Sequence, residues 1–483
     1  MTIFTVIWIT LPLLAGFSIY LLPKADRVLA LGVTLVSLAY TLGVFLHPAS
    51  LNLNLLDSFG VILLIDNLSA FFILTNTLVT AAVILYCWRT PKTSFFYTQA
   101  IILHGSLNSA FICADFISLY VALEVIGIAA FLLVAYPRQD RTLWVALRYL
   151  FISNTAMLFY LVGAILVYQS NQSFAFSGLL NAPLEALVLI VVGLLAKGGI
   201  FVSGLWLPLT HAESESPVSA LLSGVVVKAG VFPLVRCALM MEELLPLVRL
   251  FGMAAALLGV LYALFDRDTK RVLACSTLSQ LGWVLVAPSV AGPYALAHGL
   301  GKAALFLGVG NLPSRDLPTL RQNPIDTQLW LPITLASLSI SGFPLFLGFS
   351  TKMLTLKAVL PWQSWVLNLA AVGTAILYAK FIFLPHRRHD FQAFVKNPGL
   401  GVSLLLLLTA LVGLNLAYLP QTLTWFNVLK ALGVIGAGWL VWGQWIRTTP
   451  LTIPRVMENF ENLIGGMSVM LVFVFWMVWS WSW

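Results

Sequence analysis

Runs of about twenty apolar residues follow one another along this chain, separated by short polar connections. A helix of that length spans the hydrocarbon core of a bilayer, which is about 30 Å thick. The composition agrees, because 60% of the 483 residues are hydrophobic and only 9% are charged, far from the balance of soluble domains. We therefore predict an all-α polytopic membrane protein and exclude a soluble fold.

The apolar runs define sixteen predicted spans. They lie at residues 3–22, 27–46, 61–87, 95–114, 116–136, 142–168, 184–208, 217–239, 246–265, 272–290, 292–311, 328–355, 363–384, 399–419, 423–445 and 463–482. The polar stretch 47–60 is predicted to form a short hairpin on the outer face. The first run lacks a preceding positive region and a small-residue cleavage site, which favours a first span over a cleaved signal peptide.

Basic residues in the connections test that count independently, because Lys and Arg accumulate in cytoplasmic loops. They fall in alternate connections, at Lys24, Arg27, Arg89, Lys92, Arg138, Arg141, Arg267, Lys270, Arg271, Arg315, Arg321, Arg387, Arg388, Lys396, Arg447 and Arg455. The intervening connections hold almost none, with Arg236 and Arg249 as the exceptions. This alternation predicts sixteen helices with both termini on the outer side.

Nucleic-acid, metal and redox chemistry are disfavoured by the residue pattern. The net charge of +8 comes from basic residues scattered between apolar segments, and not from a basic stripe with aromatic residues. The cysteines, Cys87, Cys113, Cys237 and Cys275, stand alone without metal-ligand spacing. We expect no nucleic-acid partner, no metal, no disulfide and no cofactor, and no flavin, cluster or quinone motif is evident. Membership of an enzyme complex stays open.

Charged residues inside the predicted spans are the chemical anomaly of this chain. The basic ones in or beside the spans, apart from Arg236 and Arg249 near span ends, are Arg148, Lys197, Lys228, Lys302, Lys352, Lys357, Lys380 and Lys430, and the one carboxylate well inside a span is Glu124. Each costs about 2.5–3.5 kcal/mol at mid-membrane on insertion scales. A row of lysines with one glutamate indicates movement of charge or protons through the membrane.

Glu124 lies well inside the fifth span and Lys197 is central in the seventh. If the two face each other, each stabilises the charged form of the other, and their separation reverses this effect. Such a pair makes a proton switch. The alternative is that the two charges merely tie two helices together.

Ordered motifs surround the lysines. They are Arg148-Tyr149-Leu150, WLPLTHAESESPVSALLSG at 206–224 followed by Lys228, DTKRVLACSTLSQLG at 268–282, HGLGKAALFL at 298–307 and SGFPLFLGFSTK at 341–352. In this order they resemble the antiporter-like membrane subunits shared by complex I, the type-I NADH dehydrogenase, and the Mrp multisubunit cation/proton antiporters. The resemblance covers roughly residues 60–390.

The resemblance implies a fourteen-helix core with a C-terminal extension, and within it two five-helix repeats of inverted orientation, as in many transporters. It divides the chain into helices 1–3 with the hairpin (1–94), a first repeat (95–240), a second repeat (246–390) and C-terminal helices (399–483). The seventh and twelfth helices are expected to be broken, at Gly198, Gly199, Gly342, Pro344 and Gly348.

The resemblance also implies roles for the charged residues. Glu124 and Lys197 form the switch, and a hydrated path continues through Lys228, Lys302 and Lys352, with His298 one helical turn before Lys302. Two further residues are expected to support the path without belonging to it, Arg148 and His211, and solvation at the inner mouth is the alternative for His211. The remaining predictions are a hydrogen-bonded core role for His104 and snorkelling to the membrane edge for Lys357, Lys380 and Lys430.

The sequence departs from the family pattern directly after Lys197. The family usually carries Pro-Phe-His five to seven positions after this lysine, where the present chain has Val202-Ser203-Gly204. The seventh helix is therefore predicted to bend at its glycines, and one relay histidine is missing. Leu209 replaces an acidic residue, and Leu345 replaces the second proline of the twelfth helix.

These features predict a proton-translocating, antiporter-like subunit of a multisubunit complex in the cell inner membrane, or in a thylakoid membrane if the source is photosynthetic. Chain length and lysine at position 352 resemble the Mrp D-type subunit most, with other membrane subunits as partners and protons, with Na⁺, as the transported ions. The first alternative is a proton-pumping subunit of a type-I NADH/quinone oxidoreductase, hydrogenase or carbon-uptake complex. The others are a stand-alone metabolite transporter and a non-conducting structural subunit.

Overall fold

The computed structural model describes residues 2–47, 49–56, 60–388, 394, 396–446 and 454–481, and Arg447 of the basic connections lies outside them. Most of the described chain is helical. The helices are α1 (Thr2–Leu21), α2 (Asp26–Leu46), α3 (Asn67–Cys87), α4 (Ser94–Ile112), α5 (Phe116–Val134), α6 (Asp140–Asn171), α7 (Leu184–Lys197), α8 (Leu207–Glu213), α9 (Ser216–Leu221), α10 (Lys228–Met240), α11 (Leu245–Phe265), α12 (Thr269–Val286), α13 (Ala291–Val309), α14 (Leu317–Gln322), α15 (Thr327–Ser341), α16 (Leu347–Lys357), α17 (Pro361–Ile382), α19 (Pro398–Tyr418), α20 (Trp425–Val441) and α21 (Phe460–Trp481).

Each of the sixteen predicted ranges coincides with one helix or with a broken helix. Twelve helices of the described chain are long and apolar enough to cross a membrane, or thirteen if α12 and α13, bent by 108° at their junction, count as one span. The polytopic all-helical class is therefore confirmed, and the count of sixteen crossings stays a prediction.

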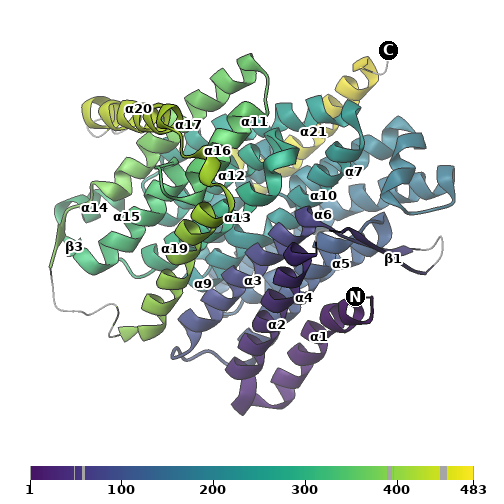
Figure 1. Ribbon diagram of the computed structural model, residues 1–483, viewed down its shortest axis with the longest axis horizontal. Coiled ribbons are helices and arrows are strands. Elements are labelled where there is room, and N and C mark those ends of the chain that lie inside the picture. Colours follow the sequence, from purple (N-terminus) through teal and green to yellow (C-terminus); the bar gives the residue numbers. More distant parts are fainter. Residues whose placement is uncertain are drawn as a thin grey trace.

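Helices of the core differ from those of the rim in their burial. Helices α10, α12 and α13 are buried on nearly every face, whereas α1, α20 and α21 expose large apolar residues along one side. A helix that is apolar all round and exposed on one face suits contact with lipid. Figure 1 shows the rim helices α1 and α20 at opposite edges of the bundle.

The polar stretch 47–60 forms the predicted hairpin, whose strands β1 (Leu51–Leu56) and β2 (Gly60–Ile65) pair antiparallel. The predicted third span was wrong at its start, because residues 61–65 belong to β2 and the helix begins only at Asn67. Asp115, the N-cap of α5, accepts hydrogen bonds from the amides of Ser118 and Ile62. The carboxylate that starts the helix therefore also fixes the strand.

Both predicted helix breaks are present. Helix α7 ends at Lys197, and the backbone turns at Gly199, whose φ of +65° strains residues with a side chain. Helix α15 ends at Ser341 and turns at Gly342, with a φ of +90°, and Pro344 lies in the same break. Gly348 was wrongly assigned to this break.

Gly348 belongs instead to α16, where the absence of a side chain lets the helix pack against the carbonyl of Ser339. A third break was not predicted from the sequence. A π-helical turn at Leu222–Val226 separates α9 from α10, directly before Lys228. The turn leaves carbonyl groups without their usual helical partners.

Connections predicted to lie on the cytoplasmic side of the membrane converge in space. Lys92 pairs with Glu215 at 2.6 Å, Arg141 pairs with Glu213 at 2.9 Å, and Lys270 donates to the carbonyl of Ser214. Three connections that are far apart in sequence thus meet at one end of the bundle. The opposite end of α5 carries the isolated bridges of Cys113 and Asp115, so the two sets of connections are segregated as the basic residues predict.

The ion pair between Asp66 and Arg236 generates a stability prediction. Asp66 caps α3 through the amide of Ser69 and pairs with Arg236 of α10. Burial acts to raise the pKa of Asp66, but the hydrogen bonds and charge of Arg236 outweigh it and hold this pKa below its usual value. The stabilisation is therefore complete above the pKa of a free carboxyl and is lost as the pH falls through the lower folded value.

We predict that Asp66→Asn, which keeps a capping oxygen but removes the charge, lowers the free energy of unfolding by about 1.5–3 kcal/mol at neutral pH. Thermal unfolding of the detergent-solubilised protein between pH 2 and 7 checks this. The melting curves of the variant and the unchanged protein should converge at the acidic end. A difference that does not depend on pH would contradict the assignment.

Candidate functional site

The four motif lysines are the most deeply buried charged side chains of the site. Lys197, Lys228, Lys302 and Lys352 expose 6%, 0%, 0% and 3% of their surface. Three of them lie at helix breaks: Lys197 ends α7, Lys228 begins α10, and Lys352 lies in α16, beyond the break at Gly342. For Lys228 and Lys352, the breaks place the ammonium groups beside backbone carbonyls at the break, those of Ser223, Gly224 and Ser341.

Lys197 is held by neutral oxygen atoms. Its Nζ donates to the carbonyl of Leu123 at 2.9 Å and to Oγ of Ser153 at 2.6 Å. A Cβ on Gly127 would stand 3.1 Å from this Nζ, so the missing side chain makes room for the ammonium group. The structure brings Glu124 and Lys197 onto neighbouring helices, but among the described residues no ion pair within 4 Å joins them.

Lys228 takes its partners from the π-helical turn. Its Nζ donates to the carbonyls of Gly224 and Ser223. Gly299 of α13 faces the same ammonium group, since a Cβ there would lie 3.5 Å from it. The unpredicted break therefore supplies the acceptors of this lysine.

Polar groups connect Lys228 with Lys302. Ser223, whose carbonyl accepts from Lys228, shares a hydrogen bond of 2.7 Å with Oγ1 of Thr277 through its hydroxyl. Thr277 donates to the carbonyl of Leu273, and the same carbonyl accepts from Nζ of Lys302 at 2.8 Å. A track of neighbouring polar groups thus joins the two lysines within the interior.

The track continues from Lys302 along α12 and α17. Lys302 donates to the hydroxyl of Tyr378 at 2.9 Å, and this hydroxyl shares a hydrogen bond with Ser276. One turn before Tyr378 in α17, the hydroxyl oxygen of Thr374 accepts from the side-chain amide of Gln280 at 3.4 Å. Polar side chains of α12 and α17 therefore lie next to Lys302 and to one another.

Lys352 is the last of the four motif lysines. Its Nζ donates to the carbonyl of Ser341 at 3.3 Å and lies 5.2 Å from the ring centroid of Trp283. Trp283 stacks on Tyr294, whose hydroxyl donates to Gln280. An aromatic face and a carbonyl at the break hold this last charge.

Both motif histidines are buried with ring nitrogens that have no protein partner among the described residues. His298 lies in α13, one helical turn before Lys302. His211 stacks on Phe306 with 4.8 Å between ring centroids. The alternative of a solvated interfacial His211 was wrong, because its exposed fraction is 0%.

Two other buried charges contact backbone carbonyls. Arg148 donates to the carbonyl of Glu458, and its supporting role stays a prediction. Lys380 does not reach solvent as predicted: it is 4% exposed and donates to the carbonyls of Ala263, Leu264 and Asp266 at the end of α11. Lys357 is exposed and Lys430 is half-buried, as snorkelling requires.

His104 is the hydrogen-bonded core histidine that we predicted. Its Nε2 lies 2.9 Å from Oγ of Ser37 and 3.1 Å from Nδ2 of Asn108. These contacts tie α2 to α4. No residue of the lysine row is among the partners found for this side chain in the described chain.

The sequence analysis missed the neutral groups that hold the lysines. These are Gly127, Ser153, Ser223, Thr277, Trp283 and Tyr378. Hydroxyl residues are common in apolar helices, and their role depends on which helix packs against which. Only Gly127 carried a local signal, because it lies three residues after Glu124 and so shares its side of α5.

Comparison with known proteins places the chain in one family. Residues 113–377 match the model of the family described as NADH:quinone oxidoreductase/Mrp antiporter, TM. The match spans more than half of the chain, and the chain belongs to this family.

Relatives come from both branches of the family. NADH-quinone oxidoreductase subunit N of Desulforudis audaxviator is 29% identical over 359 residues, covering 67% of this chain and 72% of that protein. The D-type subunit of the Na⁺/H⁺ antiporter of Alkalihalophilus pseudofirmus is 24% identical over 413 residues, covering 76% and 83%. A chain of the Mrp complex from a Dietzia species has the same fold, with a TM-score of 0.76, 17% identity, and coverage of 96% of this chain and 100% of that one.

Ser153 provides a test of the site that leaves every charged residue in place. Ser153→Ala removes one of the acceptors that stabilise the ammonium form of Lys197. Since a hydrogen bond to a charged group contributes about 1.5–3 kcal/mol, we predict that the pH profile of proton transport moves to lower pH by about one unit. A pH-sensitive dye in vesicles that hold the assembled complex gives the measurement.

The matched control is Ser170→Ala, which changes an exposed serine of the same helix. Its pH profile should be that of the unchanged protein. If Ser153→Ala also leaves the profile in place, Ser153 has no part in holding Lys197.

Proposed function

We propose that this chain moves protons along the row Glu124, Lys197, Lys228, His298, Lys302 and Lys352, as an antiporter-like subunit of a larger membrane complex. The observation that carries the proposal is the set of partners of the four lysines. Each ammonium group rests on carbonyl, hydroxyl or aromatic groups, and none has a carboxylate within 4 Å among the described residues.

Neutral partners suit proton transfer for a physical reason. A buried lysine paired directly with a carboxylate is fixed in its charged form, because removing either charge leaves the other unpaired. For a buried lysine on neutral oxygen atoms, the free-energy difference between the charged and the neutral form is smaller, and neighbouring charges decide which form is favoured. The lysine row therefore responds to the charge of its neighbours.

Water is the expected bridge where the protein groups do not touch. Buried polar atoms are almost always hydrogen-bonded, and the ring nitrogens of His298 and His211 have no protein partner in the described chain. Ordered water satisfies such groups in protein interiors. These two sites support a hydrated path beside Lys302.

Glu124 supports the switch and also the assembly. It is half-buried on a side of α5 whose residues Val121 and Ile128 are 56% and 51% exposed. A carboxylate on an outward helix face is costly against lipid. We infer that another membrane subunit covers this face, so that its charges act on Glu124 and, through Glu124, on Lys197.

The order of elements supports the two inverted five-helix repeats. The broken helices α7–α8 and α15–α16 are the fourth members of the units that begin at α4 and α11. An odd number of spans in each unit reverses the second relative to the first. Together with the segregated basic connections, this supports termini on the outer side of the cell inner membrane.

Sodium/proton exchange within an Mrp-type complex is the proposed activity. Lysine at position 352 and the D-type relative support it. The second candidate is proton pumping in a quinone-reducing complex, which the quinone oxidoreductase relative favours. Purification of the tagged chain with its companions separates them, because cluster-bearing redox subunits indicate the second candidate.

Lys197, the lysine of the switch, gives a direct test of proton movement. We predict that Lys197→Ala lowers proton transport by the assembled complex in vesicles by about tenfold or more, since it removes a proton carrier. Lys357→Ala, at an exposed lysine of α16, should stay within about twofold, as surface changes do. Unchanged transport in Lys197→Ala would refute the proposed path.

A further inference from the structure

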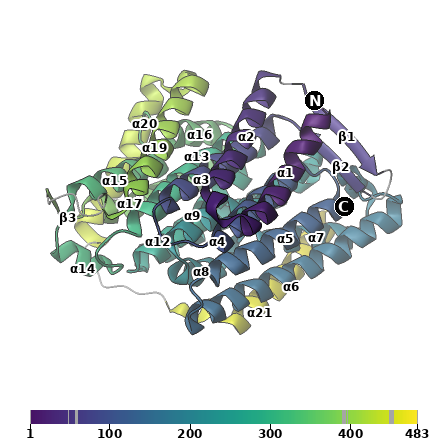
Figure 2. The same cartoon turned by 90° about the horizontal axis from the view of Figure 1, so that it is seen from below.

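The C-terminal helix lies far from the helix that precedes it in sequence. Helix α20 packs against α17, whereas α21 packs against α7 and the short helix at Phe201–Trp206 that follows Lys197. Figures 1 and 2 show the two helices on different sides of the bundle, with α21 alongside α6 and α7. The last helix therefore packs against the broken helix that ends at Lys197.

The entry to α21 is fixed by a buried cluster of charges. Glu458 is 6% exposed, and its carboxylate accepts a hydrogen bond from Arg271 of α12. Its backbone carbonyl accepts from Arg148 of α6. Arg271 also pairs with Asp266 at 2.8 Å, and Arg455 lies 3.7 Å from the carboxylate of Asp266. Glu458, which lies just before α21, thus binds α6 and α12, two helices that are far apart in sequence.

The contact with Arg148 leads directly to Lys197. Tyr149, the next residue of α6, packs against the ring of Trp206 with 5.2 Å between centroids. The indole of Trp206 donates to the carbonyl of Ala196, the residue before Lys197. One turn after Tyr149, Ser153 accepts from the Lys197 ammonium group. Helix α6 therefore carries both the contact to Glu458 and a contact to the switch.

Helix α21 also covers the segment in which this chain departs from its family. A Cβ on Gly466 would lie 3.0 Å from Val202, so α21 approaches the segment closely. The buried residues of α21 recur at helical spacing, at Leu463, Met467, Met470 and Val474. The segment that lacks the family's Pro-Phe-His is thus packed by a helix from the C-terminal extension.

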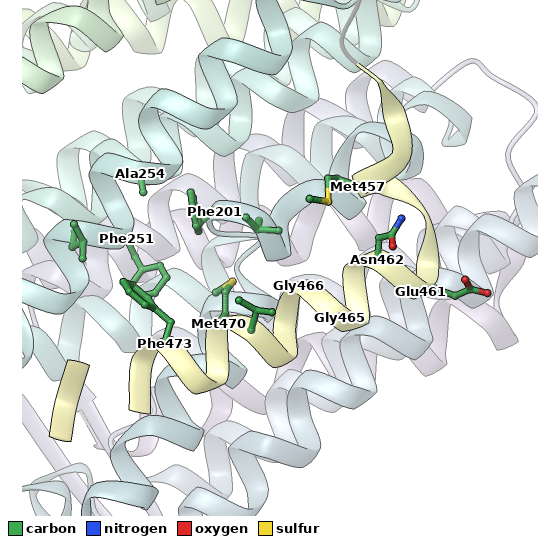
Figure 3. Close-up of a pocket in the computed structure, with 13 residues that line it drawn as sticks. Phe201, Phe251, Ala254, Met457, Glu461, Asn462, Gly465, Gly466, Met470 and Phe473 are labelled. Carbon is green, nitrogen blue, oxygen red and sulfur yellow. The ribbon is translucent and has the colours of Figure 1, made fainter. Parts of the chain in front are cut away.

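The same segment borders free space. A cavity of about 690 Å³ lies between α21 and α11, and Phe201 and Val202 form part of its wall. Figure 3 shows Phe201 opposite Met470 and Phe473 of α21 across this cavity. Phe201 has a φ of +56°, a strained value for a residue with a side chain. The segment after Lys197 is therefore not held by dense packing alone.

We propose that Glu458 is a positioning residue for the proton switch: through Arg148 and Arg271 it anchors α21 on the broken seventh helix and so sets the place of Lys197. This inference rests on the proposed function only for its effect on transport. The anchoring itself is a statement about structure and is tested separately.

The test compares Glu458→Gln with Glu461→Gln, an exposed glutamate three residues further on, in the purified complex. Hydrogen exchange followed by mass spectrometry reports on residues 198–206. We expect this segment to exchange at least about threefold faster in Glu458→Gln, because its opening costs less free energy, and at an unchanged rate in Glu461→Gln. The pH profile of proton transport should move in Glu458→Gln alone.

Each outcome decides one statement. Unchanged hydrogen exchange both in Glu458→Gln, which removes the charge paired with Arg271, and in Arg148→Lys, which weakens the contact with the carbonyl of Glu458, overturns the anchoring, whatever transport does. Faster exchange with an unmoved pH profile overturns the effect on Lys197. If Lys197→Ala transports normally, the proposed function fails, while the exchange experiment still decides the anchoring.

Should Glu458→Gln fail to assemble, Arg148→Lys takes its place, because it keeps the buried charge but weakens the contact with Glu458. Faster exchange of residues 198–206 is again the expected result. An unchanged rate in this variant overturns the proposal.

Discussion

Placing ammonium groups on backbone carbonyls inside a membrane is the constraint on which the rest of this structure depends. Removing a charge from water costs several kcal/mol even after relaxation, and carbonyl or hydroxyl oxygens of the protein must offset that cost. The π-helical turn before Lys228 and the break before Lys352 supply carbonyl partners for these two lysines. Lys197 and Lys302 donate instead to carbonyls inside α5 and α12.

Glycines complete the same arrangement. Gly127 faces the ammonium group of Lys197, Gly299 faces that of Lys228, and Gly342 lies against the side chain of Lys352. At each position a Cβ would stand within 4 Å of the lysine. The missing side chains leave room for a long, charged side chain to reach its carbonyl partners.

Sequence patterns predicted the helices, the two breaks at glycines and the place of the four lysines within the helices. Each of these features depends on local composition or on an ordered motif. The third break was missed because residues 222–226 read as an ordinary apolar run. Lys380 was misplaced for a different reason: its partners, the carbonyls at the end of α11, come from a distant part of the chain. Whether Glu124 pairs with Lys197 also depends on helix packing, which periodicity does not specify.

The central claim is that protons pass between Lys228 and Lys302 along the polar groups that lie between them. Thr277→Val tests it most directly, because it removes the hydroxyl that links Ser223 to the carbonyl of Leu273 while keeping the shape of the side chain and all four lysines. Proton transport by the assembled complex in vesicles should fall by about tenfold or more, whereas Thr409→Val, on an exposed face of α19, should leave the rate unchanged. Transport at the full rate in Thr277→Val would contradict the account.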